Sequence, residues 1–197
     1  LAEGAVASVA GGNKILRDGR RLLNRTTLEL SGGTLFLDNL SAAGATFENL
    51  GTVNVVDGAG IAWNNFDGAR PVSFINTGTF NKSGAGTQTD ISTPFTNSGV
   101  VDVREGTLNL QQNTEHSGSV LLATGTELRL NSGTHTFAAG SVLTGEGQLR
   151  LQGTGGTFAE PVGVTGAVTL AGGDWTFHGD QVFGELNQSG GTMQGGG

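Results

Sequence analysis

The chain contains no cysteine and no tyrosine, and only three prolines and two tryptophans. Without cysteine it has neither disulfides nor thiolate ligands for a metal ion. The scarcity of proline argues against stiff proline-rich linkers. No apolar run approaches the roughly 20 residues that a membrane-spanning helix needs. We therefore expect no direct insertion into a membrane.

Glycine is abundant instead, with 36 of the 197 residues, against a typical share of about 7%. It does not recur at every third position, which excludes a collagen triple helix. β-branched and aliphatic residues continue throughout the chain, which argues against disorder. Beyond the first two dozen residues, Gly, Thr, Ser or Asn interrupts every stretch of good helix formers. The composition predicts strands and turns over nearly the whole chain.

Charge is unevenly placed within a net charge of −7. Half of the ten basic residues lie in one opening segment: Lys14, Arg17, Arg20, Arg21 and Arg25. The rest of the chain is acidic, and its field repels nucleic acid and anionic lipid. We predict no nucleic-acid partner. A basic segment of this kind is typical of a solvated face or a cap, with contact to a polyanion as the alternative.

Four segments of the first half repeat one pattern, in which Asn follows hydrophobic residues and, in the last three copies, precedes Gly by two positions. The segments are 22–28, 47–53, 74–80 and 95–101, and their asparagines are Asn24, Asn49, Asn76 and Asn97. A second series follows, with Leu or Val flanking the middle residue of 128–130, 149–151 and 168–170 and a phenylalanine after each: Phe137, Phe158 and Phe177.

A period near 20 residues with two or three short alternating strands predicts one coil of a β-solenoid. We therefore predict an all-β fold, a right-handed single-stranded parallel β-helix with coils of about 20 residues. It should form one solenoid over residues 1–197, as a fragment of a longer protein. Residues 1–21 are expected to be an irregular or capping segment.

The repeated asparagines predict a structural ladder. An amide carries donors and an acceptor, so it can satisfy the backbone of a tight turn while it stacks on its counterpart in the next coil. The glycine two residues later suggests a positive φ at that turn. Thr26 stands where the other copies have glycine, so the first turn is expected to differ. Alternation places Trp175 inside the solenoid with Phe177.

These F-x-N-x-G-T-F and G-T-L-x-L units, over about residues 20–194, resemble those of Gly-rich bacterial surface proteins. The family includes autotransporter passengers and filamentous-haemagglutinin-type adhesins. The resemblance implies secretion to the extracellular space or cell surface, a parallel β-helix and a spacer or adhesive role. It provides no catalytic residues to transfer.

A search for reactive groups predicts no catalytic, cofactor-binding or metal-binding residues. The nearest approach to a cluster is formed by Asp102, Arg104 and Glu105 with Glu127 and Arg129 about one coil further on, and paired outer-face charges are its ordinary interpretation. The histidines are His116, His135 and His178, and alternation puts the last two on different faces. A shared metal site is not expected.

The only candidate for glycan contact is Trp63 with Asn64 and Asn65, in the longest interval between repeats. Sugar-binding surfaces stack saccharide rings on exposed aromatic side chains. The alternative is a tryptophan that anchors the core or a loop.

The leading functional prediction is a noncatalytic extracellular module that spaces or presents binding regions at a bacterial surface. The alternatives are a polysaccharide-active β-helix enzyme and a glycan-binding module. Expected partners are host or matrix glycans or proteins. The open sheet edges at the ends of a solenoid also permit end-to-end self-association.

Overall fold

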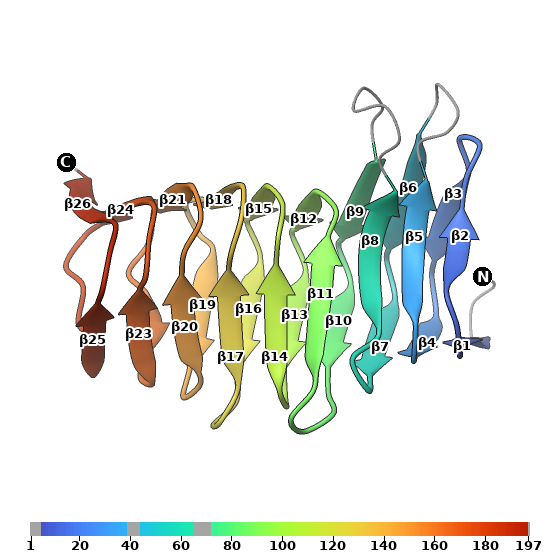
Figure 1. The fold of residues 1–197 in the computed structure, drawn as a ribbon, viewed down its shortest axis with the longest axis horizontal. Coiled ribbons are helices and arrows are strands. Elements are labelled where there is room, and N and C mark those ends of the chain that lie inside the picture. Colours follow the sequence, from blue (N-terminus) through green and yellow to red (C-terminus); the bar gives the residue numbers. More distant parts are fainter. Residues whose placement is uncertain (1–4, 39–43, 65–71, 197) are drawn as a thin grey trace.

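A computed structural model describes residues 5–38, 44–64 and 72–196. These residues form three parallel sheets that stack as a β-solenoid of about eight coils of roughly 21 residues (Figure 1). The described ranges contain no helix. The predicted all-β parallel solenoid is confirmed. At about 4.8 Å per coil, the stack is roughly 38 Å long.

Each coil contributes one strand to each sheet, except that the last described coil adds strands to sheets B and C alone. Sheet A contains β1 (Val6–Ala10), β4 (Thr27–Ser31), β7 (Thr52–Val56), β10 (Thr79–Lys82), β13 (Val100–Val103), β16 (Ser119–Leu122), β19 (Val142–Gly145) and β22 (Gly163–Val164). Sheet B contains β2 (Lys14–Leu16), β5 (Thr34–Asp38), β8 (Gly60–Asn64), β11 (Gln88–Ser92), β14 (Thr107–Leu110), β17 (Glu127–Leu130), β20 (Gln148–Leu151), β23 (Ala167–Leu170) and β25 (Glu185–Gln188). Sheet C contains β3 (Arg21–Asn24), β6 (Ala45–Asn49), β9 (Val72–Asn76), β12 (Phe95–Asn97), β15 (Thr114–His116), β18 (Thr134–Phe137), β21 (Gly155–Phe158), β24 (Asp174–His178) and β26 (Thr192–Gly196).

Strand alternation builds the core. In sheet B, Leu108, Leu128 and Leu149 lie in register on successive strands and are fully buried, while the residues between the leucines point outward. Burying one such leucine contributes roughly 1.5–3 kcal/mol. Because every coil repeats this pattern, one apolar interior runs along the described solenoid.

Residues 1–21, for which the sequence suggests an irregular or capping segment, contribute strands in their described part. β1 pairs with β4 over five residue positions, and β2 pairs with β5 over three. The opening segment therefore adds a coil with the same three-sided arrangement as those that follow.

The asparagine ladder is present in sheet C. Asn24, Asn49, Asn76 and Asn97 lie in register and are fully buried. Each Nδ2 donates to the Oδ1 of the next asparagine, with N–O distances of 2.8, 2.7 and 2.7 Å along the column. The same Nδ2 atoms also reach backbone carbonyls in the next coil; Asn49, for example, donates to the Thr79 carbonyl at 2.9 Å. The ladder joins turns of four successive coils.

The predicted reason for the glycine after each asparagine is wrong. None of Gly51, Gly78 and Gly99 has a positive φ. Instead, successive turns approach too closely for a side chain: a Cβ on Gly78 would lie 2.0 Å from the Gly51 carbonyl oxygen, and one on Gly99 would lie 2.1 Å from that of Gly78. Thr26 occupies the equivalent place in the first turn, where its hydroxyl donates to the carbonyl of Ala5.

Replacing Gly78 with alanine is therefore expected to lower the free energy of unfolding by about 1–3 kcal/mol, as overpacking against rigid neighbours does. Gly172→Ala is the matched control. Its Cβ would meet nothing closer than 3.9 Å and its φ is not positive, so stability should barely change. Chemical denaturation of both variants measures the difference. Equal stability of the two variants would contradict the close-approach explanation.

The interior of sheet C changes character midway along the solenoid. One interior column begins with Leu22, Phe47, Phe74 and Phe95 and continues with Thr114, His135, Gly156, Trp175 and Met193. The neighbouring column contains the four asparagines and then His116, Phe137, Phe158 and Phe177. The stacked phenylalanines therefore move from the first column to the second. Thr114, His116 and His135 occupy the crossover.

Candidate functional site

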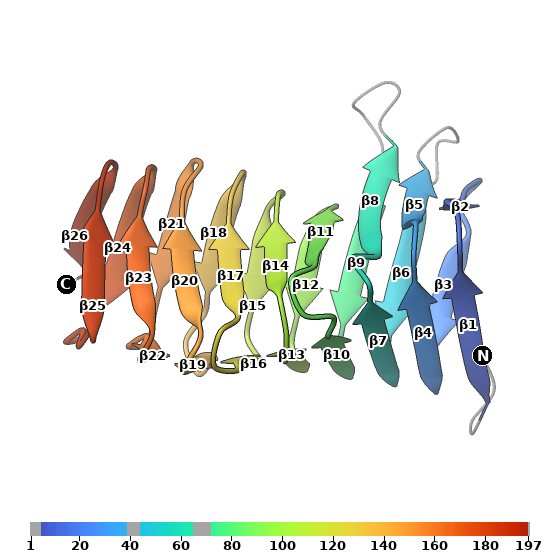
Figure 2. The same cartoon turned by 60° about the horizontal axis from the view of Figure 1, so that its bottom comes forward.

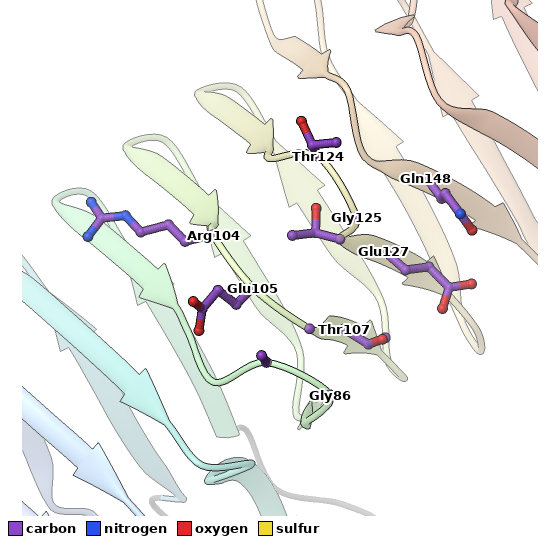
Figure 3. Close-up of a pocket in the computed structure, with 11 residues that line it drawn as sticks. Gly86, Arg104, Glu105, Thr107, Thr124, Gly125, Glu127 and Gln148 are labelled. Carbon is purple, nitrogen blue, oxygen red and sulfur yellow. The ribbon is translucent and has the colours of Figure 1, made fainter.

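A hollow lies at the corner where sheet A passes into sheet B (Figure 3). Three successive connections differ in length there: residues 83–87, 104–106 and 123–126. The shortest connection, residues 104–106, lies between the two longer ones. This difference in length leaves a notch of about 390 Å³ beside residues 104–106. Arg104, Glu105, Thr124, Glu127 and Gln148 are among its lining residues. We call this hollow the corner notch.

Two carboxylates line the corner notch, and both are engaged by groups of their own coil or the preceding one. The Glu105 carboxylate accepts a hydrogen bond from the Gly84 backbone N–H at 2.8 Å. The Glu127 carboxylate accepts from Arg129 Nε at 2.7 Å. Each carboxylate is therefore oriented by a partner on the chain itself.

The structure divides four members of the predicted cluster, Asp102, Arg104, Glu127 and Arg129, into two ion pairs. Arg104 Nε lies 2.7 Å from Asp102 Oδ2, and an Arg129 guanidinium nitrogen lies 2.6 Å from Glu127 Oε2. Of these four residues, only Arg104 and Glu127 line the corner notch. Glu105, the fifth member of the predicted cluster, lines the notch with them because it follows Arg104 in the short connection.

Beside the corner notch, the outer side chains of sheet B form a hydrogen-bonded polar surface. Asp90 Oδ1 accepts from Gln88 at 2.8 Å, from Asn109 at 2.7 Å and from Gln111 at 3.1 Å. Arg129 donates to the Gln88 side chain at 2.9 Å, across two coils. Further along the sheet, Arg150 donates to Gln152, which donates to Asn131. We call these side chains, with Glu127, the polar face; its amides and guanidinium groups are held in place by one another.

The predicted glycan contact falls partly outside what the structure describes. Asn65 lies outside the described residues, and for Asn64 only the strand position is described. Trp63 is half-buried, packs against the core and lies in register with the fully buried Leu37. The other tryptophan, Trp175, is fully buried, as predicted, and its indole nitrogen donates to the Gly172 carbonyl at 2.8 Å.

Comparisons of the chain with protein-family models, curated protein sequences and solved structures find no match. Within residues 5–38, 44–64 and 72–196, no group of three His, Asp or Glu side chains could hold a metal ion. The same ranges contain no helix long and apolar enough to cross a membrane. Function has to be inferred from the contacts, burial and charge of the chain's own residues.

Lys82 is a buried charge that sequence reasoning missed. It occupies an inward position of β10, in register with the buried Val55 and Val103. Its Nζ donates to Thr87 Oγ1 at 3.0 Å and to the carbonyls of Ser83, Gly84 and Glu105 at 2.7, 3.4 and 3.1 Å. Burial lowers the pKa of Lys82, while the negative charges of Glu105 and Asp57 oppose that shift. The ammonium group thus joins two walls of the corner notch.

Replacing Lys82 with methionine keeps an unbranched side chain in the core but removes all of these donors. We expect the free energy of unfolding to fall by about 1–3 kcal/mol, because buried acceptors lose their partners. Amide hydrogen exchange should become faster in residues 83–87 and 104–106 and stay unchanged in β18 and β21, which serve as the internal control. If amide exchange in residues 83–87 and 104–106 were as slow in the variant as in the unmodified chain, that result would contradict this role for Lys82.

Two of the three histidines are buried in the interior of sheet C. His116 stacks on Phe137 with ring centroids 4.4 Å apart, and neither of its ring nitrogens has a hydrogen-bond partner. His135 Nδ1 lies 2.9 Å from Thr114 Oγ1, and its Nε2 has no partner. Burial, followed by the nearby His135, lowers the pKa of His116 to about 3; burial lowers the pKa of His135 to about 4 despite an opposing backbone hydrogen bond at Ser132. His178 is half-exposed, so His135 and His178 do lie on different faces.

Proposed function

We propose that the chain is a noncatalytic structural module of a secreted or cell-surface bacterial protein, a rod that spaces or presents binding regions. The observation that carries this proposal is the continuity of the interior: the same three-sided cross-section repeats through about eight coils. A stack of this kind holds whatever it carries at a fixed separation, because each coil is hydrogen-bonded to its neighbours.

The ion pairs and hydrogen bonds of the charged side chains support the same proposal. Asp102 and Glu127 are each paired with the arginine two residues later, and Glu105 is held by a backbone N–H. Glycoside hydrolysis needs one carboxyl group that donates a proton and a second that acts as base or nucleophile. The corner notch offers no such unengaged pair among the described residues.

Incubation of the purified chain with a panel of plant, bacterial and animal polysaccharides tests the noncatalytic assignment. We expect no release of reducing ends or of unsaturated products. Turnover that disappears in Glu127→Gln or Asp102→Asn, with folding retained by circular dichroism, would overturn the proposal in favour of the enzyme. Antibody labelling of intact source cells tests the surface location, and signal only after permeabilisation would count against it.

Glycan binding without chemistry is a second candidate function, favoured by the polar face. Its side chains are already oriented by hydrogen bonds, so little conformational entropy would be lost when sugar hydroxyls replace water. A glycan array tests this candidate. Binding that is lost in Gln88→Ala but kept in Trp63→Ala would assign the polar face, and the reverse pattern would assign the Trp63 region.

A further inference from the structure

A second hollow lies on the outer face of sheet B, over strands β5, β8 and β11. These strands are neighbours in the sheet, and Figure 2 shows them side by side. The hollow has a volume of about 140 Å³, and the strands on either side of β8 contribute Phe36 and Asp90 to its lining. It shares no lining residue with the corner notch. We call it the aromatic hollow.

Small residues of β8 form the floor of the aromatic hollow. Gly60 and Ala62 line it and lie in register with Thr34 and Phe36 of β5. A Cβ on Gly60 would lie 3.4 Å from Thr34 Oγ1 and 3.2 Å from the Asp90 carbonyl oxygen, so a side chain at this position would occupy the space between β5 and β11. The hollow therefore exists because β8 has small residues where its neighbours have longer side chains.

Phe36 is an aromatic ring outside the core. It alternates with the buried Leu35 and Leu37, so it points outward, and it is half-buried. Of the phenylalanines in residues 5–38, 44–64 and 72–196, it alone is not part of the apolar core and contacts no other ring. In the next two coils its column carries Ala62 and Ser92, which leave one side of the ring uncovered.

Asp90 has one carboxylate oxygen fixed and the other open. Its Oδ1 accepts the three hydrogen bonds of the polar face, from Gln88, Asn109 and Gln111. Among the described residues nothing donates to Oδ2, and Asp90 takes part in no ion pair. A carboxylate that is already oriented can accept strong hydrogen bonds from a ligand with little further loss of conformational entropy.

These groups match the chemistry of a neutral sugar residue. The C–H face of a sugar ring stacks on an exposed aromatic ring, and its hydroxyls can donate to a carboxylate. Thr34 and Ser92, which also line the hollow, carry hydroxyl groups that can both donate and accept, as sugar hydroxyls do. The volume leaves room for one sugar residue.

Charged ligands fit the aromatic hollow less well. The Asp90 carboxylate and the net charge of −7 repel the carboxylates of uronic and sialic acids. A quaternary ammonium group is attracted to a ring beside a carboxylate, but sites for such groups surround the cation with several rings. It would also bring no donor for the Asp90 oxygen or for the hydroxyls of the lining.

We propose that the aromatic hollow binds one neutral sugar residue of a polysaccharide, which stacks on the Phe36 ring and donates a hydrogen bond to Asp90 Oδ2. The proposal rests on the glycan-binding candidate given under Proposed function, and it assigns that candidate a position and a class of sugar. Because Asp90 belongs to both the hollow and the polar face, the adjoining sugar residues would lie along the polar face.

Isothermal titration calorimetry with short neutral oligosaccharides of glucose, mannose and galactose tests the proposal, with oligogalacturonate and choline as charged probes. At least one neutral probe should bind, and Phe36→Ala should weaken that binding about tenfold, because the stacking contact is lost. Leu121→Ala is the matched control. It also removes an exposed apolar side chain from a strand, but on sheet A, so binding should stay unchanged.

Two further variants test the floor and the carboxylate. Ala62→Leu fills the hollow without touching the polar face and should abolish binding. Asp90→Asn keeps the size of the side chain but removes its charge; neutral probes should bind about tenfold more weakly, and the discrimination against oligogalacturonate should shrink. Circular dichroism establishes that each variant is folded.

The outcomes separate this site from glycan binding in general. Binding of a neutral probe that survives in Phe36→Ala or in Ala62→Leu, but is lost in Gln88→Ala, would overturn the aromatic hollow and keep the polar face as the glycan site. Absence of binding by every neutral probe would overturn both. Tighter binding of choline or oligogalacturonate than of any neutral probe would refute the assigned class of ligand.

Discussion

Replacing Asn76 with alanine is expected to lower the free energy of unfolding by about 3–5 kcal/mol, the largest effect we predict for a single residue. Asn76 is fully buried in the middle of the ladder. Its amide nitrogen donates to Asn97 Oδ1 at 2.7 Å and to the Val100 carbonyl at 3.1 Å, and its oxygen accepts from Asn49 at 2.7 Å. Truncation removes these bonds, leaves buried partners unsatisfied and opens a cavity.

Denaturant unfolding measures this loss, with Asn187→Ala as the matched control. Asn187 is exposed on β25, and its side chain bonds only the Glu185 carboxylate, so its replacement should change stability by less than about 0.5 kcal/mol. Asn76→Asp should be worse than alanine at neutral pH, since a carboxylate would face the Asn97 oxygen and backbone carbonyls. Equal effects at positions 76 and 187 would disprove the stabilising role of the ladder.

Acidification is expected to destabilise the solenoid by about 4 kcal/mol between pH 7.5 and pH 5. The folded pKa values of His116 and His135 are about 3 and about 4, below the 6.5 of an unperturbed histidine. At pH 5 the unfolded chain therefore binds two protons that the folded chain does not. Each histidine contributes about 1.4 kcal/mol per pH unit to this difference.

The sign follows from the lowered folded pKa values. Stability from the two neutral histidines is fully present above about pH 6.5 and decreases as the pH falls towards 4 and then 3. Below those pH values both histidines are protonated in the folded and in the unfolded chain. They then no longer change the free energy of unfolding as the pH falls. Denaturant midpoints measured at intervals of pH would trace the curve.

The double variant His116→Phe with His135→Phe is the control for this prediction. His116→Phe extends the stack of Phe137 and Phe158 by one ring, while His135→Phe gives up the contact with the Thr114 hydroxyl. Whatever its stability at neutral pH, the double variant should lose most of the slope between pH 6.5 and 4. An unchanged slope would assign acid sensitivity to the carboxylates instead.

The sequence was sufficient to predict the solenoid because its strongest signals are periodic. Asn24, Asn49, Asn76 and Asn97 recur at nearly one coil length, and alternation around Leu108 and Leu128 marks the inward face. These patterns depend only on spacing along the chain. The sequence does not reveal the role of Gly78, because the close approach of Gly51 in the preceding turn is a contact between coils, which spacing along the chain does not show.

The candidate site was harder to predict for the same reason. The corner notch exists because connections 83–87, 104–106 and 123–126 differ in length, which requires knowing where each strand ends. Lys82 could have been found by strict alternation from Phe80, which places it inside, although a lysine is rarely buried. His116 gave no signal, because the shift of phenylalanines between columns becomes visible only when the coils are in register.

Both halves of the rod contain stacked phenylalanines along sheet C, because the aromatic stack only changes column midway. The two stacks are separated at Thr114, His116 and His135, where polar side chains occupy both columns. Because both buried histidines lie in this short stretch, acid should loosen the middle of the molecule first. The amide-linked coils on one side and the phenylalanine-stacked coils on the other would then come apart from each other before either loses its own interior.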